Sequence, residues 1–136
     1  MKNSLIKVSE NAGNNAQALE GVYINSRKQL SNGGNVLLDC SDLHQIDVES
    51  AKRLFGCLLI DNGSGPITCK NLRYQLFKNI ADGIQLRFSE KYPQGIQTRW
   101  GSSRITKPQV EMINGSMWST IQLGEEVTHL LQKDIL

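Results

Sequence analysis

The sequence predicts an α/β domain, in which helices alternate with the strands of one sheet. Two short apolar runs, Val36–Leu38 and Ile67–Cys69, are each bounded by turn residues, as buried strands often are. Between them, apolar residues recur with the period of a helix from Ala51 to Leu59. A strand, a helix and a second strand in this order favour a parallel pair joined by a right-handed crossover. A further helix after the second run extends the pattern to α/β layering.

Length and composition are those of one globular domain, residues 1–136. Hydrophobic residues make up 39% of the chain and charged residues 21%, as is usual for soluble proteins. A net charge of +2 argues against binding to nucleic acid through many phosphate contacts. No apolar run approaches the roughly 18 residues of a membrane span, and the N-terminal MKNSLIKVSE lacks the apolar segment of a signal peptide. We therefore expect no membrane contact and a cytoplasmic location.

The N-terminal third predicts a short strand and a helix. Leu5–Val8 is a candidate strand, and Ala16–Leu30 has apolar residues at helical spacing. The glycines of SNGGN, residues 31–35, favour a helix end, because Gly33 or Gly34 can adopt a left-handed backbone conformation.

The next segment predicts a buried strand, a loop and an amphipathic helix. The continuous run Val36–Leu38 is typical of a strand buried on both faces by helices. Asp47 is expected to cap the following helix, with Glu49 placed favourably against the helix dipole. One face of this helix carries an apolar stripe of Ala51, Leu54, Phe55, Leu58 and Leu59.

A second strand and helix follow, and the pattern then changes. Ile67–Cys69 predicts the strand, and Asn71 is expected to cap a helix that runs to Asp82-Gly83. After Gly83, apolar and polar residues alternate at 84–88 and 96–100, which favours strands. Asn114-Gly115 between Gln109–Ile113 and Met117–Ile121 is a strong signal for a hairpin. The tail, 125–131, predicts a short C-terminal helix.

Residues 35–83 resemble the STAS superfamily, the domains of sulfate transporters and anti-sigma-factor antagonists. The shared pattern is a strand ending in Asp, a loop closing on an apolar residue and Asp or Ser, then a helix, a strand and a helix. It reads here VLLD, SDLHQID, a helix, ITCKNL and a helix. IDVESAKRLFG, from Ile46, is similar to the helix start of uncharacterised bacterial STAS-like domains. The resemblance implies a STAS-like β-α-β-α core over 1–83, to which 84–136 adds antiparallel strands and a terminal helix on the same sheet.

The resemblance also implies a regulatory or protein-interaction role rather than catalysis. Regulatory STAS domains carry a phosphorylatable Ser or Thr just after the loop Asp. Val48 and Glu49 occupy that place here, and Ser50 falls inside the expected helix. A phospho-switch is therefore not expected at this point, although Glu49 offers a constitutive negative charge.

Polar residues gather in the loop between the first buried strand and its helix. The ligand- or partner-binding candidates are Asp39, Ser41, Asp42, His44, Asp47 and Glu49. Ligands usually bind at the carboxyl end of strands in open α/β sheets. Turn and cap chemistry explains the same residues, and we favour that interpretation. No catalytic residue, metal site or cofactor is expected, and Cys40, Cys57 and Cys69 are interpreted as buried small hydrophobes.

Two further interpretations remain open. The basic residues Arg87, Lys91, Arg99, Arg104 and Lys107, with Tyr92 and Trp100 among them, form a basic-aromatic cluster. With the loop 39–49, strands 87–107 would form a pocket for an anion or small molecule, in a binding protein or an enzyme, or alone a nucleic-acid surface. We expect a protein partner and a homodimer, built through the C-terminal strands with Trp100, Met117 and Trp118 at the interface.

Overall fold

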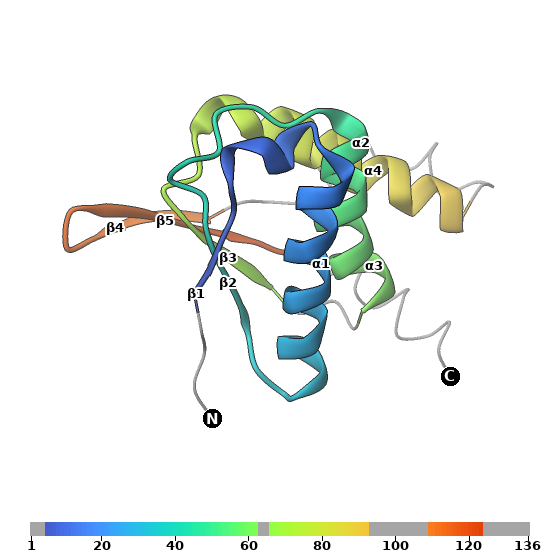
Figure 1. Cartoon of the computed structure of the whole chain (residues 1–136), viewed down its shortest axis with the longest axis horizontal. Helices are drawn as coiled ribbons and strands as arrows, with labels where there is room; N and C mark the ends of the chain where they lie inside the picture. The colour runs from blue at the N-terminus through green and yellow to red at the C-terminus, as the bar shows by residue number, and fades with distance from the viewer. Residues whose placement is uncertain (1–4, 63–65, 93–108, 124–136) are drawn as a thin grey trace.

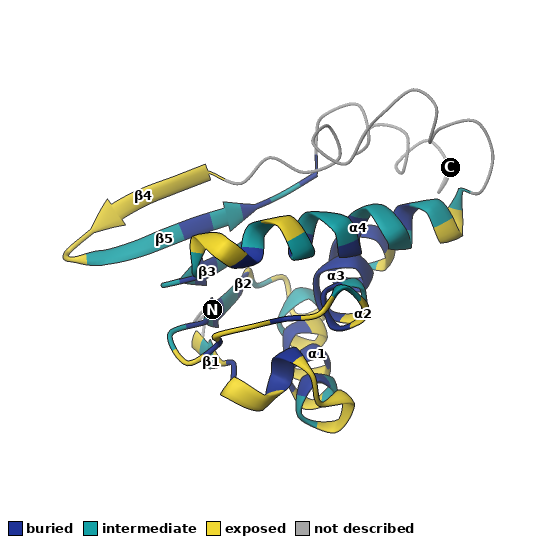
Figure 2. Ribbon diagram, turned by 90° about the horizontal axis from the view of Figure 1, so that it is seen from above, coloured by how far each residue is buried: buried dark blue, intermediate teal, exposed yellow. Residues whose placement is uncertain are grey.

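The computed structural model of the chain describes residues 5–62, 66–92 and 109–123. They form an α/β fold, with one five-stranded mixed sheet and helices gathered on one side of it (Figures 1 and 2). In chain order the elements are β1 Leu5–Lys7, the 3-10 helix η1 Glu10–Gly13, α1 Ala16–Ser31, β2 Val36–Asp39, α2 Val48–Ala51, the π-helix η2 Lys52–Gly56, α3 Cys57–Asp61, β3 Ile67–Lys70, the 3-10 helix η3 Tyr74–Leu76, α4 Phe77–Lys91, β4 Gln109–Ile113 and β5 Ser116–Ile121.

The sheet has the strand order β1-β2-β3-β5-β4. β1, β2 and β3 are parallel neighbours, so the predicted parallel pairing of Val36–Leu38 with Ile67–Cys69 is confirmed. β5 pairs antiparallel with β3, and β4 is the edge strand beyond it. Residues opposite each other in a sheet project to the same face. The register therefore defines a helix face, with Leu38, Cys69 and Ser119, and an open face on the other side.

The strands alternate in burial because the described helices cover one face only. Val36 and Leu38 are fully buried beneath the helices, whereas Leu37 on the open face is half-buried. The expectation that this strand is buried on both faces is therefore wrong. Leu37 makes the apolar run continuous, but the described helices cover only the opposite face of the sheet.

α2, η2 and α3 form one continuous helix with a π turn in its middle. Leu54, Phe55 and Leu59 on the predicted stripe have no exposed surface, and Asp47 caps the helix as expected. α4 packs closely against this helix. A Cβ on Gly83 would lie 2.5 Å from the Lys52 backbone nitrogen, so only glycine permits this approach.

The boundaries predicted for the next helix are wrong at both ends. Asn71 does not cap it; its backbone has φ 56°, and α4 begins only at Phe77, after η3. Gly83 lies inside α4, which continues to Lys91, so 84–88 is helix rather than strand. Ile80, Ile84 and Phe88 recur every four residues and are all buried, which is helical spacing.

The C-terminal hairpin is confirmed. Asn114 and Gly115 have φ values of 51° and 81°, the positive values that a two-residue type I′ turn requires. Both strands join the sheet of the N-terminal half, through β5 and β3. The strand expected at 96–100 and the helix expected at 125–131 lie outside the described residues. Among the described helices, none combines the length and apolar character needed to cross a bilayer.

Candidate interaction surfaces

The first polar group of the loop lies at the carboxyl ends of β2 and β3. Asp39 accepts hydrogen bonds from the Ser41 hydroxyl at 2.6 Å and from the Ser41 backbone N–H at 3.1 Å. The Ser41 Oγ accepts in turn from the Asn71 Nδ2 at 3.1 Å. The bond from the Ser41 hydroxyl is the main reason that the pKa of Asp39 is lowered. Asp39 therefore stays ionised and holds a local turn, which is structural chemistry.

The remaining loop residues also have local partners. Asp42 pairs with Lys7 at 3.2 Å, Asp47 accepts from the Ser50 backbone N–H at 2.7 Å, and Glu49 pairs with Lys52 at 3.1 Å. His44 is exposed. These bonds divide the six predicted residues into a group at the strand ends and a group at the helix start. Within the described ranges, no three His, Cys, Asp or Glu side chains are placed to hold a metal ion.

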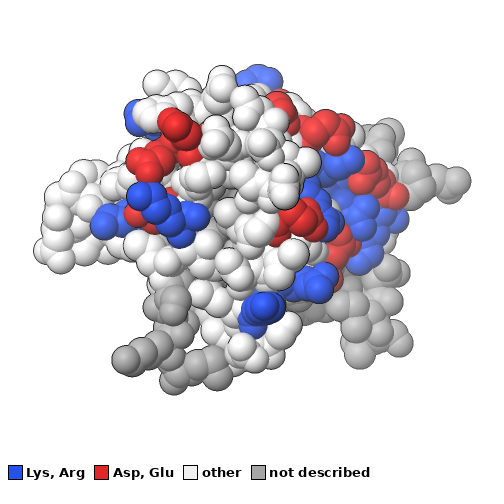
Figure 3. Space-filling model, in the orientation of Figure 1, with Lys and Arg blue, Asp and Glu red and all other residues white. Residues whose placement is uncertain are grey.

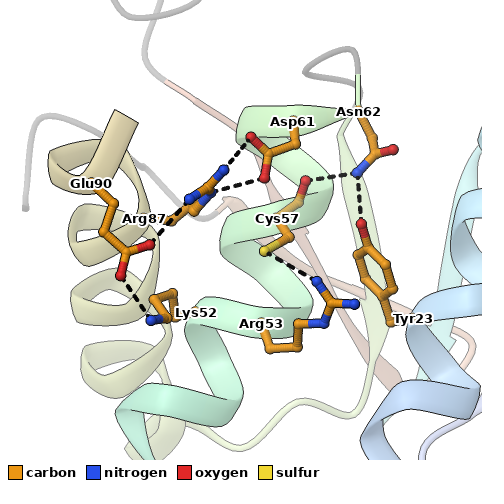
Figure 4. Close-up of polar contacts among 8 residues, drawn as sticks. All are labelled: Tyr23, Lys52, Arg53, Cys57, Asp61, Asn62, Arg87 and Glu90. Carbon is orange, nitrogen blue, oxygen red and sulfur yellow. Dashed lines mark hydrogen bonds and ion pairs between the residues drawn. The ribbon is translucent and has the colours of Figure 1, made fainter. Parts of the chain in front are cut away.

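Arg87, a member of the basic-aromatic cluster that the structure describes, is bound by carboxylates. Arg87 lies on α4 and not on a strand, which corrects its predicted place. Its guanidinium bonds Asp61 at 2.8 and 2.9 Å and Glu90 at 3.1 Å (Figure 4). Lys52 bonds the same Glu90 at 2.8 Å. Arg99, Arg104, Lys107 and Trp100 lie outside the described residues, so the anion pocket stays a prediction for them.

A second set of contacts ties η2 and the end of α3 to α1. The Arg53 guanidinium carbon lies 4.1 Å from the centre of the Tyr23 ring, and its Nε bonds Glu20 at 3.0 Å. The Asn62 Nδ2 donates to the Tyr23 hydroxyl at 3.2 Å (Figure 4). Burial raises the pKa of the Cys57 thiol, so it behaves as a buried apolar group. All three cysteines are buried, as expected.

Charges of both signs are therefore interspersed on the surface. Figure 3 shows two groups of charged side chains on one face of the molecule, one over the helices and one over the strand ends. Lys and Arg atoms adjoin Asp and Glu atoms in both groups. On the described part of this face, mixed charge of this kind gives no strong field for a polyanion.

An apolar groove lies where the hairpin meets the start of α4, and sequence reasoning missed it. Its volume is about 590 Å³, and Tyr74, Gln75, Phe77, Lys78, Val110 and Met117 line it. The Tyr74 side chain is 80% exposed and Val110 is 49% exposed. Large apolar side chains left open together mark interaction sites more often than scattered ones do. Val110 and Tyr74 meet only through the fold, so no local signal in the sequence predicts the groove.

The edge strand β4 adjoins this groove. All five of its residues are exposed, including Met112 at 67% and Ile113 at 45%. Val110 and Met112 lie opposite Ser119 and Met117, so their side chains project to the helix face. Figures 1 and 2 show the hairpin extending beyond the helices that cover the rest of the sheet. The groove and the β4 edge together form what we call the hairpin surface.

The open face of the sheet carries a row of polar side chains. The register places in this row Lys7, Asp39, Lys70, Trp118 and Glu111. The Lys70 Nζ lies 6.0 Å from the centre of the Trp118 ring. Met117 and Trp118, both expected at an interface, thus lie on opposite faces of the hairpin, and only Met117 lines the groove.

Comparison of the chain with protein-family models, with curated proteins and with solved structures finds no significant match. The interpretation of these surfaces therefore depends on their own geometry.

Proposed function

We propose that the protein is a non-enzymatic STAS-like module that acts by binding another protein chain through the hairpin surface. The observation that carries the proposal is the open apolar groove beside an exposed edge strand. The order of strand, loop, helix, strand and helix from 36 to 91 supports the STAS-like part. Protein interfaces favour large aromatic and Met side chains at their centre, and Tyr74, Phe77 and Met117 supply them here.

The loop supports binding without a phospho-switch. Ser50 is buried, and its backbone N–H is bonded by the Asp47 cap. A kinase needs an exposed hydroxyl, so Ser50 is a poor acceptor in the folded protein. Glu49 is exposed and provides a permanent negative charge at the start of α2, paired with Lys52.

The competing function is a small-molecule binder. The groove volume of about 590 Å³ lies within the range of ligand pockets, roughly 300–1,000 Å³. Its lining offers few polar groups to orient a ligand, and the carboxylates of the loop are engaged elsewhere. We therefore favour a protein as the occupant over a small ligand or anion.

Site-specific photo-crosslinking in the host cell tests the proposal. A photoreactive phenylalanine analogue replaces Tyr74 in the groove, and in a matched control it replaces Ile24, which is 41% exposed on α1. We expect a discrete protein adduct from position 74, identifiable by mass spectrometry as a second copy or another protein, and none from position 24. No adduct at 74, together with a thermal shift by a nucleotide or anion, would favour the small-molecule function instead.

A further inference from the structure

We infer that β4 pairs with β4 of a second copy, antiparallel and with Glu111 on the two-fold axis, so that two sheets join into one of ten strands. This inference rests on the proposed function, because it names the partner of the hairpin surface. The partner is a second copy, and the register of β4 sets which residues pair. It follows from the exposure of β4, from the symmetry of its side chains and from the position of the groove.

Within the described residues, β4 has only one of the features that keep edge strands apart, the charge of Glu111. Natural edge strands are blunted by charged side chains, especially Lys, by Pro, by bulges or by a covering element. β4, with the sequence QVEMI, contains neither Lys nor Pro, and its register with β5 runs without a bulge. Its five residues are exposed on both faces. Such a strand is a template for another strand of matching pattern.

The pattern of β4 matches itself. Val110 and Met112 flank Glu111, so an antiparallel two-fold centred on Glu111 places Val110 of each copy opposite Met112 of the other. Both side chains project to the helix face, as their partners on β5 do. On the open face, Gln109 lies opposite Ile113 in each half. All five residues are paired in this register, whereas a centre at Val110 or Met112 leaves two residues at one end of β4 without a partner.

The groove extends the same contact. Val110 lines the groove with Tyr74 and Phe77 of its own chain. Pairing through β4 brings the two grooves to either side of the junction, where Met112 of one copy covers Val110 of the other. Five paired residues alone form a small interface, below the roughly 1,200 Å² of stable complexes. We therefore expect a weak dimer, with dissociation in the micromolar range or above.

One contact in the dimer is unfavourable, so a substitution that removes it should strengthen dimerisation. Glu111 faces Glu111 of the second copy on the open face, and like charges directly opposite are destabilising in a sheet. Glu111→Gln should therefore tighten the dimer, by roughly two- to fivefold. Met112→Lys, at a residue that is 67% exposed, should abolish dimerisation and leave the fold intact.

Cysteine cross-linking reads the register directly. Residues opposite each other in an antiparallel pair have Cα atoms about 4.5–5.5 Å apart, within the range of a disulfide. Glu111→Cys should form a disulfide-linked dimer under mild oxidation, seen as doubled mass on a non-reducing gel. Gln109→Cys is the matched control and should not cross-link, because it faces Ile113. The native thiols Cys40, Cys57 and Cys69 are buried and do not compete.

The outcomes separate this inference from the proposed function. Sedimentation equilibrium that shows only monomer up to roughly 1 mM would overturn the inference. Cross-linking of Val110→Cys or Met112→Cys in place of Glu111→Cys would overturn its register. An adduct of photoreactive residue 74 with a different protein would sustain the proposed function in both cases. If photoreactive residue 74 forms no adduct with any protein, the proposed function is overturned. A Glu111→Cys disulfide would still support the pairing of β4, and its absence would overturn that pairing.

Discussion

Gly83 shows how one residue fixes the contact between two helices. A Cβ there would lie 2.5 Å from the Lys52 nitrogen and 2.7 Å from the Ala51 Cβ, and the backbone cannot yield as a flexible side chain does. Gly83→Ala should therefore lower the free energy of unfolding by about 1–3 kcal/mol. Urea denaturation measures this loss.

Gly21 is the matched control for this substitution. It lies in α1, and a Cβ would meet nothing within 4 Å. Gly21→Ala should raise the stability by about 0.5–1 kcal/mol, because alanine favours helix. Equal stability of Gly83→Ala and the natural protein would contradict the close approach of the two helices.

At the residue scale, chemistry that acts locally is predictable and packing is not. The sequence predicts that Asp47 caps a helix, and its side chain does so, because the carboxylate and the N–H that it accepts from are three residues apart. Asp82-Gly83 predicts a helix end equally well by local rules. Whether a glycine ends a helix or admits a neighbouring backbone depends on a partner 31 or more positions away, which the local sequence does not name.

Asn71 joins the end of β3 to β5 and to the loop after β2. Its backbone N–H donates to the Met117 carbonyl at 2.6 Å, and its side-chain Oδ1 accepts from the Met117 N–H at 3.1 Å. Asn71→Ala should lower the stability by about 1–3 kcal/mol, through the lost side-chain bonds and the strain of φ 56°. Hydrogen exchange at the Met117 amide should accelerate.

Two variants separate these effects. Asn71→Gly relieves the backbone strain but still loses the bonds, so the stability should recover only in part. Asn79→Ala removes a bond of 2.8 Å from its side chain to the Ile46 carbonyl, away from the hairpin. If Asn79→Ala accelerates exchange at Met117 as much as Asn71→Ala does, Asn71 does not anchor the hairpin.

At the element scale, the strands and the hairpin follow from local pattern. β2, β3 and the Asn114-Gly115 turn lie where apolar runs and turn residues place them. The alternation of three apolar residues at 84–88 fits a strand, whereas the helical period of this segment appears only when Ile80 is included. The hairpin surface could not be predicted, since residues 74 and 117 come together only through the pairing of β3 with β5.

Across the whole molecule, ionised carboxylates contribute to stability at neutral pH. Hydrogen bonds from Arg53, Ser41 and Lys52 lower the pKa values of Glu20, Asp39 and Glu90, respectively. A lowered pKa in the folded state stabilises above the unfolded values, about 3.9 for Asp and 4.3 for Glu. This contribution is lost as the pH falls through the folded-state values. The urea concentration at the unfolding midpoint should therefore decrease as the pH is lowered from about 5 to about 3.

Glu20→Gln is the control for this titration. The substitution removes one of the three carboxylates, so the variant should be less stable at pH 7 and should lose less stability on acidification. A midpoint that stays constant or rises towards pH 3 would show that these ion pairs do not stabilise the folded state.

The order of strands in the sheet has a consequence for synthesis. β1, β2 and β3 follow one another in both the chain and the sheet. Each strand that leaves the ribosome can therefore pair with the strand synthesised before it. The pairs of this parallel unit join residues about 30 positions apart across helical crossovers, and pairing at such separation is slower than the closing of a hairpin. Among the described elements the hairpin comes last, and β5 must then pair with the free side of β3. A pause in translation once residue 92 has left the ribosome would thus expose the β3 edge until β5 and β4 follow.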